Sequence, residues 1–356
     1  DDVLNYHKIL FNIKDKIITF VVMKLLRKIL FPFNPLYYSV VFLRNKCFDF
    51  GIFKSKSYQT PIICVGNLSV GGTGKTPMIE ALIQLLQKEY NIAILSRGYG
   101  RKSKGFVLAK NTSTAKILGD EPYQIAQKFP NVTVAVDANR QRGIDRLLHL
   151  DLPPDVILLD DAFQHRKVKP GLSILLTAYD NLFCDDVILP SGNLREPRTG
   201  VQRAQTVIVT KSPNNLSSIE KDNIAKRLAL HPNQNLFFSS IVYSSEIVSK
   251  TDSIFLEELK TKNFTLVTGI ANAKPLVNYL KRLNLNFEHL EYDDHHEFSK
   301  KELKEISSKS FVLTTEKDFS RLQSLQHKTL YYLPITTQIH DVSTLEKIVK
   351  DFIKNS

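Results

Sequence analysis

The sequence is poor in cysteine and in long apolar runs. Its three cysteines, Cys47, Cys64 and Cys184, lie far apart, which argues against a disulfide framework or a zinc site and fits a reducing compartment. No apolar run reaches the ~18 residues that a membrane-spanning helix needs, and Ile17–Met23 falls well short of that length. Internal repeats and basic patches interleaved with aromatic residues, which single-stranded nucleic acid would require, are also absent from the sequence.

Acidic residues are outnumbered, so the chain of 356 residues is strongly basic. It has 48 Lys and Arg against 36 Asp and Glu, a formal net charge of +12. Such a charge calls for an anionic partner, which is nucleic acid, a membrane surface or a phosphorylated substrate. The length predicts two domains, and a composition that is 43% hydrophobic and 24% charged is typical of a globular protein.

Half of the net positive charge lies in residues 1–58, which hold ten Lys and Arg against four Asp. This segment is also rich in Ile, Leu, Phe, Val and Tyr, and Pro32 and Pro35 interrupt it. Basic and apolar character without spanning length predicts a segment that lies on an anionic membrane surface. The alternative is a basic helix pair packed on its own domain. Because Met23 makes a natural start, we expect residues 1–22 to be a non-native extension.

The sequence is organised around residues 61–80, PIICVGNLSVGGTGKTPMIE. A short apolar strand, a glycine-rich turn, Lys75-Thr76 and an apolar pattern of helical period follow one another, which is the order of a phosphate-binding loop. Glycines let the backbone aim its N–H groups inward, and the new helix presents its positive end to an anion. The predicted loop consists of Ser69, Val70, Gly71, Gly72, Thr73 and Gly74.

This loop assigns roles to the residues that follow it. Lys75 can reach the β- and γ-phosphates, and the Thr76 hydroxyl can hold Mg²⁺. Ser69 stands where the usual G-x-x-x-x-G-K-[ST] pattern has its first glycine. The alternative is an ordinary glycine-rich turn between a strand and a helix.

A second signal is the apolar run Val156–Leu159, which ends in Asp160-Asp161. Carboxylates at the end of a buried strand, downstream of a phosphate loop, suit Mg²⁺ beside a nucleotide. The alternative is a turn-forming pair of aspartates. His165 follows close behind, and although a lone histidine is more often structural, this one lies near the predicted metal site.

Several other polar residues open helices or loops. Asp120 begins a predicted helix, where an acid is commonly only a cap. Arg140 follows the strand 132–136 at its carboxyl end, where ligands bind in open α/β sheets. Arg195 lies in a basic loop and could clamp phosphate, or the loop is simply a solvated surface. The Asp/His cluster at 293–297 is too tight for a tetrahedral metal site, but a histidine oriented by an acid could assist proton transfer.

Strands alternate with helical segments through residues 60–230, which predicts a parallel sheet with helices on both faces. A strand-helix-strand unit restarts over 264–298, so we expect a second, smaller α/β domain. The segment 235–247 alternates and is predicted to be an extended connector, and 344–353 is predicted to be an amphipathic helix. The stretches 310–322 and 329–335 are predicted to supply further strands.

Taken together, the motifs resemble the tetraacyldisaccharide 4′-kinase family of the lipid A pathway. The matching stretches, which run from about residue 30 to residue 320, are GNLSVGGTGKTP (66–77), SRGYGR (96–101), GDEP (119–122), VAVDANRQRG (134–143), LLDDAFQHR (158–166), LPSGNLREP (189–197), YDDHHEF (292–298) and TTEKD (314–318). The ordered series is far more specific than a glycine loop alone. Ala162 replaces the glycine of the family's usual Asp-Asp-Gly-Phe-Gln-His.

The resemblance implies an α/β protein with a P-loop NTPase-like parallel sheet, a smaller α/β domain and a membrane-associated helical N-terminal segment. It implies ATP- and Mg²⁺-dependent phosphorylation of the 4′-hydroxyl of tetraacyldisaccharide 1-phosphate, giving lipid IVA, at the cytoplasmic face of the inner membrane. We expect a monomer without a nucleic-acid partner. The implied division is a membrane segment (1–58), a kinase domain (59–234), an extended hinge (235–249), a smaller domain (250–335) and a C-terminal helix (336–356).

The resemblance also implies residue roles. Lys75 is similar to the γ-phosphate ligand, and Thr76, Asp160 and Asp161 are similar to the metal ligands. Asp120 resembles the general base and His295 the histidine that pairs with it, while His296 matches less well. The residues that match positions stabilising charge or ordering the nucleotide site are Arg140, Arg195, Glu196 and the nearby His165.

Two other functions compete with a kinase. A phosphate-loop GTPase or metallochaperone-like switch needs Asn-Lys-x-Asp after a later strand. Thr210-Lys211 supplies half of this motif, with Pro213 where the aspartate would stand. The other competitor is a membrane adaptor with a relict nucleotide site.

Overall fold

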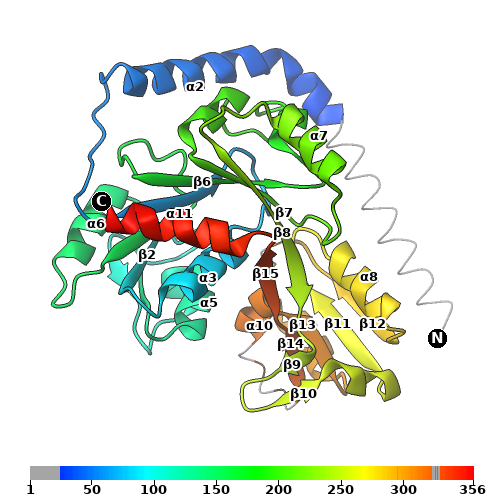
Figure 1. Cartoon of the computed structure of the whole chain (residues 1–356). Coiled ribbons are helices and arrows are strands. Elements are labelled where there is room, and N and C mark those ends of the chain that lie inside the picture. Colours follow the sequence, from blue (N-terminus) through cyan, green and yellow to red (C-terminus); the bar gives the residue numbers. More distant parts are fainter. Residues whose placement is uncertain (1–24, 295, 323–324, 326, 328) are drawn as a thin grey trace.

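The protein is described by a computed structural model that covers residues 25–294, 296–322, 325, 327 and 329–356. The expectation for residues 1–22 and the position of His295 lie outside these residues. The chain folds into a large lobe, built on a nine-stranded sheet, and a small lobe, built on a six-stranded sheet (Figure 1). The predicted combination of a large α/β unit with a second, smaller one is therefore confirmed.

The large sheet has the strand order β15-β8-β7-β6-β1-β5-β2-β4-β3. Its strands are β1 (Ile62–Asn67), β2 (Ile92–Ser96), β3 (Val107–Leu108), β4 (Thr133–Val136), β5 (Val156–Asp160), β6 (Leu172–Ala178), β7 (Thr206–Thr210), β8 (Asn235–Tyr243) and β15 (Ile335–Ile339). The seven neighbouring strands β4, β2, β5, β1, β6, β7 and β8 pair in parallel. The edge strands β3 and β15 pair in antiparallel fashion with β4 and β8. The carboxyl ends of the parallel strands therefore meet at one edge of the sheet.

Helices cover both faces of this sheet, as the sequence predicts. They are α3 (Lys75–Leu86), α4 (Ala115–Leu118), α5 (Asp120–Lys128), α6 (Arg140–Leu148), α7 (Ser218–Leu228) and α11 (Val342–Lys354). Residues of α3, α5 and α11 share one apolar core with one side of the strands, and residues of α6 and α7 share the other. In β1, Ile62 and Cys64 point into one core, and Ile63 and Val65 point into the other. Burial on both faces explains why the strands are apolar runs instead of alternating patterns.

The helix α2 (Asn34–Asp49) follows the short turn η1 (Phe31–Phe33) and lies along the outside of the large lobe, far from the small lobe (Figure 1). Only Asn34 and Phe48 of α2 are buried. Polar contacts attach it, since Arg44 donates to the Gln164 carbonyl at 2.9 Å and Tyr37 donates to the Arg195 carbonyl at 3.1 Å. In the described part of the chain, no helix combines the length and the apolar character needed to cross a membrane.

The small lobe has the strand order β10-β9-β14-β13-β11-β12. Its elements are β9 (Glu246–Val248), β10 (Ser253–Phe255), β11 (Phe264–Thr268), α8 (Lys274–Arg282), β12 (Phe287–Glu291), α9 (Lys300–Ser307), β13 (Val312–Thr315), α10 (Glu316–Leu322) and β14 (Leu330–Leu333). The stretch 310–322 supplies the predicted strand as β13, but its second half forms the helix α10, which the sequence did not predict. The Thr315 hydroxyl accepts the N–H of Asp318 at 3.2 Å and starts the helix, which buries Phe319 and Leu322.

Two segments connect the lobes. The chain leaves the large sheet after β8 and returns to it at β15, and these two strands pair with each other in antiparallel fashion. Residues 336–339, assigned to the C-terminal helix from the sequence, are instead part of β15. The β-branched run Ile335-Thr336-Thr337 favours strand at this position, and the helix begins only at Val342.

Candidate nucleotide and metal site

The glycine-rich loop connects β1 to α3 at the carboxyl edge of the large sheet. Gly71 and Gly74 have φ angles of 106° and 80°, which favour glycine because a Cβ is strained in this region. Ser69 is buried and pairs with Leu194, while Val70, Gly71 and Gly72 are exposed. The start of α3 is therefore accessible to solvent. The backbone N–H groups of the first turn of a helix have no partner within the helix, so this end of α3 attracts an anion.

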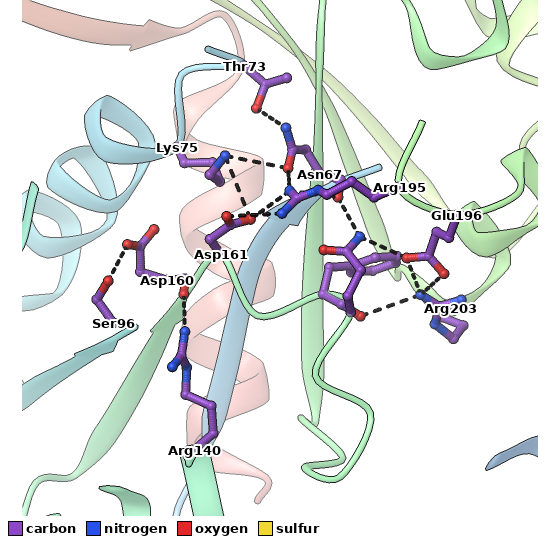
Figure 2. A network of polar contacts seen from close by, with 12 residues as sticks. Asn67, Thr73, Lys75, Ser96, Arg140, Asp160, Asp161, Arg195, Glu196 and Arg203 are labelled. Atoms are coloured by element: carbon purple, nitrogen blue, oxygen red, sulfur yellow. Dashed lines mark hydrogen bonds and ion pairs between the residues drawn. The ribbon is translucent and has the colours of Figure 1, made fainter. Parts of the chain in front are cut away.

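Side chains from neighbouring strands hold the loop in this shape. Asn67 at the end of β1 donates to the Thr73 hydroxyl at 2.8 Å (Figure 2). Thr210 at the end of β7 donates to the Thr73 carbonyl at 2.8 Å, and Lys211 donates to the Gly72 carbonyl at 2.6 Å. Lys211 has a φ of 57°, an uncommon conformation for lysine that brings its ammonium group to the loop.

A cluster of opposite charges lies where the loop enters α3. The Lys75 ammonium is 3.7 Å from an Asp161 carboxylate oxygen, and Arg195 forms two bonds with the same carboxylate at 2.8 and 3.1 Å (Figure 2). Arg195 also contacts the side-chain oxygen of Asn67. Burial alone would raise the pKa of Asp161, but Arg195 and Lys75 hold that pKa below its ordinary value. Two cations are thus held close to the anion-binding end of α3.

Asp160, at the end of β5, is almost fully buried. The Ser96 hydroxyl donates to one of its oxygens at 2.9 Å, and the other oxygen has no hydrogen-bond partner among the described residues. Burial, followed by the charges of Glu121 and Asp161, raises the pKa of Asp160 to about 7. A buried carboxylate oxygen without a partner fits a divalent cation, which would favour the ionised form.

The donors present decide which metal fits. Among the described residues, no group of three His, Cys, Asp or Glu side chains gathers in a way that could enclose a metal ion. A zinc site needs such a group, whereas Mg²⁺ is commonly held by one or two carboxylates, waters and the phosphates of a substrate. Asp160, Asp161 and the Thr76 hydroxyl on α3 therefore fit Mg²⁺ beside a phosphate.

Arg140 and His165 lie close enough to these aspartates to interact with their charges. Arg140 is 2% exposed, and its guanidinium donates to the backbone carbonyls of Asp137 and Asp160, the latter at 3.3 Å. Burial lowers the pKa of Arg140. Burial, helped by the charges of Arg140 and Arg97, lowers the pKa of His165 to about 4, so its imidazole is neutral at pH 7. Arg140 thus supports the Asp160 backbone from within the protein.

Glu196 lies in a buried cluster that Gln164 joins to the Asn67 carbonyl, at 2.8 Å. It is 2% exposed, and Arg203 donates to both of its oxygens at 2.8 and 2.9 Å (Figure 2). Gln164 and Asn45 also donate to it, at 2.8 and 3.2 Å. Because Asn45 lies on α2 and Gln164 lies in the loop that follows Asp161, Glu196 connects that helix to this loop. These partners occupy the Glu196 carboxylate, which does not contact Lys75.

Asp120 is the first residue of α5, and its carboxylate forms an ion pair with Arg321 of the small lobe. The structure therefore places this predicted base where the two lobes meet. His295 lies outside the described residues. His296 contacts Glu302 at 3.0 Å and stacks on Tyr292 with ring centroids 4.9 Å apart, so it packs within the small lobe.

Sequence reasoning missed several residues of this site. Asn67 and Ser96 lie inside the quoted motifs, but nothing in their spacing showed that they hold Thr73 and Asp160. Lys211 was noted only as half of a GTPase motif, although its position after a strand was a usable signal. No pattern in the sequence pointed to Arg321, because its partner lies 201 positions away.

Comparisons with known proteins agree with this geometry. The family model described as tetraacyldisaccharide-1-P 4′-kinase matches residues 26–354. A tetraacyldisaccharide 4′-kinase of Flavobacterium johnsoniae is 54% identical over 336 residues, which cover 92% of this chain and 98% of that protein. Its counterpart in Bacteroides thetaiotaomicron is 48% identical over 341 residues, covering 88% and 89%. The crystal structure of the "apo" form of LpxK from Aquifex aeolicus in complex with ATP is similar, with a TM-score of 0.76, 30% identity, and coverage of 92% and 99%.

Proposed function

The chain belongs to the tetraacyldisaccharide-1-P 4′-kinase family, and from this membership we propose how its residues carry out the reaction. The enzyme uses ATP and Mg²⁺ to phosphorylate the 4′-hydroxyl of tetraacyldisaccharide 1-phosphate, which yields lipid IVA in lipid A biosynthesis. The observation that supports this function best is the glycine loop beside Lys75, together with the Asp160 oxygen that has no hydrogen-bond partner in the described part of the chain. Family membership sets aside the GTPase-like switch and the relict adaptor.

The loop and its two cations bind the triphosphate. The exposed N–H groups at Gly71 and Gly72 and the start of α3 face the β- and γ-phosphates. Lys75 now contacts Asp161, and in the complex it moves its ammonium to the γ-phosphate. Arg195 is held by Asp161 and Asn67, so its guanidinium is already oriented to offset charge on the transferred phosphoryl group.

Thr76, Asp160 and Asp161 are the residues that hold Mg²⁺. When bound, Mg²⁺ neutralises phosphate charge and fixes the phosphate geometry for an in-line transfer. Ser96 keeps one oxygen of Asp160 occupied and so fixes the direction of the other. Arg140 supports the same residue through its backbone carbonyl, and Glu196 orders the loop behind it. His165 stays neutral and adds no further positive charge to this region.

Asp120 accepts the proton of the 4′-hydroxyl, and His295 relays or tunes that proton. Asp120 lies where the two lobes meet, so we propose that it pairs with His295 only when the lobes are together. We assign a packing role to His296 because Glu302 and Tyr292 already contact its ring.

The acylated substrate places the enzyme at the cytoplasmic face of the inner membrane, where we propose that it acts as a peripheral monomer. The exposed side chains of α2 support this proposal, since Leu36, Val40 and Leu43 are 66%, 61% and 65% exposed. Arg44 and Lys46 lie on the same helix, and cations beside apolar side chains favour an anionic lipid surface.

The direct test is incubation with ATP, Mg²⁺ and tetraacyldisaccharide 1-phosphate, followed by mass spectrometry of the lipid. We expect a gain of one phosphate with the wild-type protein and none with Lys75→Met. Asp120→Ala and His295→Ala are expected to lower kcat by about 10²-fold or more, the range for general acid–base groups. Folded wild-type protein that leaves the lipid unchanged would overturn the proposed function, and normal turnover by Asp120→Ala would remove the role of that residue alone.

A further inference from the structure

Two helices meet where the lobes come together. α5 of the large lobe packs against α10 of the small lobe, and an ion pair closes each end of the contact. Asp120 at the start of α5 pairs with Arg321 near the end of α10, and Lys128 at the end of α5 pairs with Glu316 at the start of α10. The helices therefore run antiparallel, and each acid lies at the N-terminus of its own helix, where the helix dipole also favours it.

The Arg321 guanidinium is held by the small lobe before it reaches Asp120. One of its terminal nitrogens donates to Asp318 at 3.1 Å and to the Gly269 carbonyl at 3.4 Å. Asp318 is fully buried and is itself fixed by the Gly269 N–H at 2.8 Å and the Thr315 hydroxyl at 2.7 Å. The guanidinium therefore has a fixed orientation within the small lobe.

The other two nitrogens of Arg321 both donate to the same oxygen of Asp120, at 2.5 and 3.0 Å. The Arg321 side chain is only 10% exposed, so little water competes for these bonds. Two bonds from a planar guanidinium fix the position of that carboxylate oxygen more narrowly than the single point charge of a lysine does.

The far end of the contact ties α10 to the phosphate-binding loop. Lys128 lies between two acids, with its ammonium 2.7 Å from Glu80 and 3.0 Å from Glu316. Glu80 is 4% exposed and lies on α3, the helix that the phosphate loop starts, and Gln124 donates to it at 2.9 Å. Lys128 thus links α10, through Glu316, to α3, through Glu80. α3 is the helix that follows the phosphate loop.

We propose that Arg321 is a positioning residue, which aims the Asp120 carboxylate, and that Glu80, Lys128 and Glu316 set the distance between that carboxylate and the phosphate loop. The inference rests on the proposed role of Asp120 as the base. Separating the lobes would leave Asp120, Arg321 and Glu316 without these partners across the interface, so the arrangement also favours the closed lobes.

The test compares Arg321→Met and Arg321→Lys with the wild type, by steady-state kinetics at saturating lipid. For Arg321→Met we expect kcat to fall by about 10- to 100-fold, the loss caused by moving a reacting group by about 1 Å, with an unchanged KM for ATP. Arg321→Lys keeps a cation beside the buried Asp318 but loses the two-nitrogen contact, so its kcat should lie between the other two.

A role confined to folding predicts a different outcome. In that case Arg321→Lys, which satisfies Asp318, would have wild-type kcat, and this result would overturn the proposal even if Arg321→Met fails to fold. Equal losses in kcat and in ATP affinity would also overturn it. If the wild type makes no phosphorylated lipid, the proposed function itself has failed, and that outcome is separate from these comparisons.

Glu316→Gln tests the far end, with hydrogen exchange of residues 316–322 as the readout. We expect faster amide exchange in α10 and a kcat lower by about two- to fivefold, the shift that one ion pair causes in an equilibrium. The matched control is Glu89→Gln, which breaks the 2.5 Å pair with Lys350 inside the large lobe and should change neither quantity. Wild-type exchange and kcat in Glu316→Gln would show that this pair does not hold the lobes.

Discussion

Gly66→Ala is the substitution that tests most directly how the fold positions the two aspartates proposed to bind Mg²⁺. Gly66 lies near the end of β1, directly under the loop that leaves Asp160 and Asp161. A Cβ at this position would lie 2.7 Å from the Phe163 Cβ and 3.1 Å from the Phe163 backbone nitrogen. The first separation is about 0.8 Å less than the roughly 3.5 Å at which two carbon atoms attract best.

Neither neighbour can move away by rotating a side chain, because one is backbone and the other is attached to it. The loop itself must shift by a substantial fraction of an ångström, and Asp161 moves with it. Overpacking of a buried site costs about 1–3 kcal/mol, so we expect a lower Tm. A displacement of about 1 Å at reacting groups lowers rates by up to about 10²-fold, so we expect kcat to fall by at least tenfold.

Gly171→Ala is the matched control for this experiment. A Cβ there would lie 2.5 Å from two atoms at the far end of the Phe352 side chain, so it overpacks the large lobe more mildly than at Gly66. Gly171 precedes β6 at the amino ends of the strands, the edge opposite the phosphate loop. We therefore expect a lower Tm with wild-type kcat. If Gly66→Ala turns over at the wild-type rate, contact between β1 and this loop does not position Asp161.

Three further predictions concern single side chains. Lys211→Met removes the bond to the Gly72 carbonyl, so the KM for ATP should rise by about two- to tenfold in steady-state assays, with no rise if the loop holds its shape alone. Burial raises the pKa of Cys64 to about 12, so iodoacetamide at pH 8 should label it only after unfolding, as peptide mass spectrometry would show. Burial alone would raise the pKa of Asp137, but Arg142 holds it below its ordinary value. This stabilisation is present above the unfolded pKa and is lost as pH falls, so the Tm difference between wild type and Asp137→Asn should shrink from pH 6 to pH 3; a constant difference would contradict it.

Local sequence patterns predicted well the secondary structure around the candidate nucleotide site. The apolar run before Gly66, the helical period after Lys75 and the buried run before Asp160 all became the expected elements, because each depends on burial that a local pattern records. The family resemblance added the reaction and the substrate, which no local pattern contains.

Contacts between distant segments could not be predicted in this way. Arg321 lies in a stretch that the sequence analysis assigned to strand, and its partner Asp120 belongs to the other lobe. Glu196 matched a site position in the family, yet its carboxylate is occupied by Arg203 and Asn45. The role of each of these two residues depends on which charged side chain the fold places next to it. The spacing of residues in the sequence does not contain that information.

The return of the chain to the large sheet has a consequence for protein synthesis. Leu345, Val349 and Ile353 of α11 belong to the apolar core that α3 forms with one face of the large sheet. When synthesis has reached β14, the small lobe is complete, but this core of the large lobe still lacks the apolar side chains of α11. The large lobe, whose strands are mostly synthesised first, is thus completed last. We therefore expect chaperones to retain nascent chains that are arrested before residue 342.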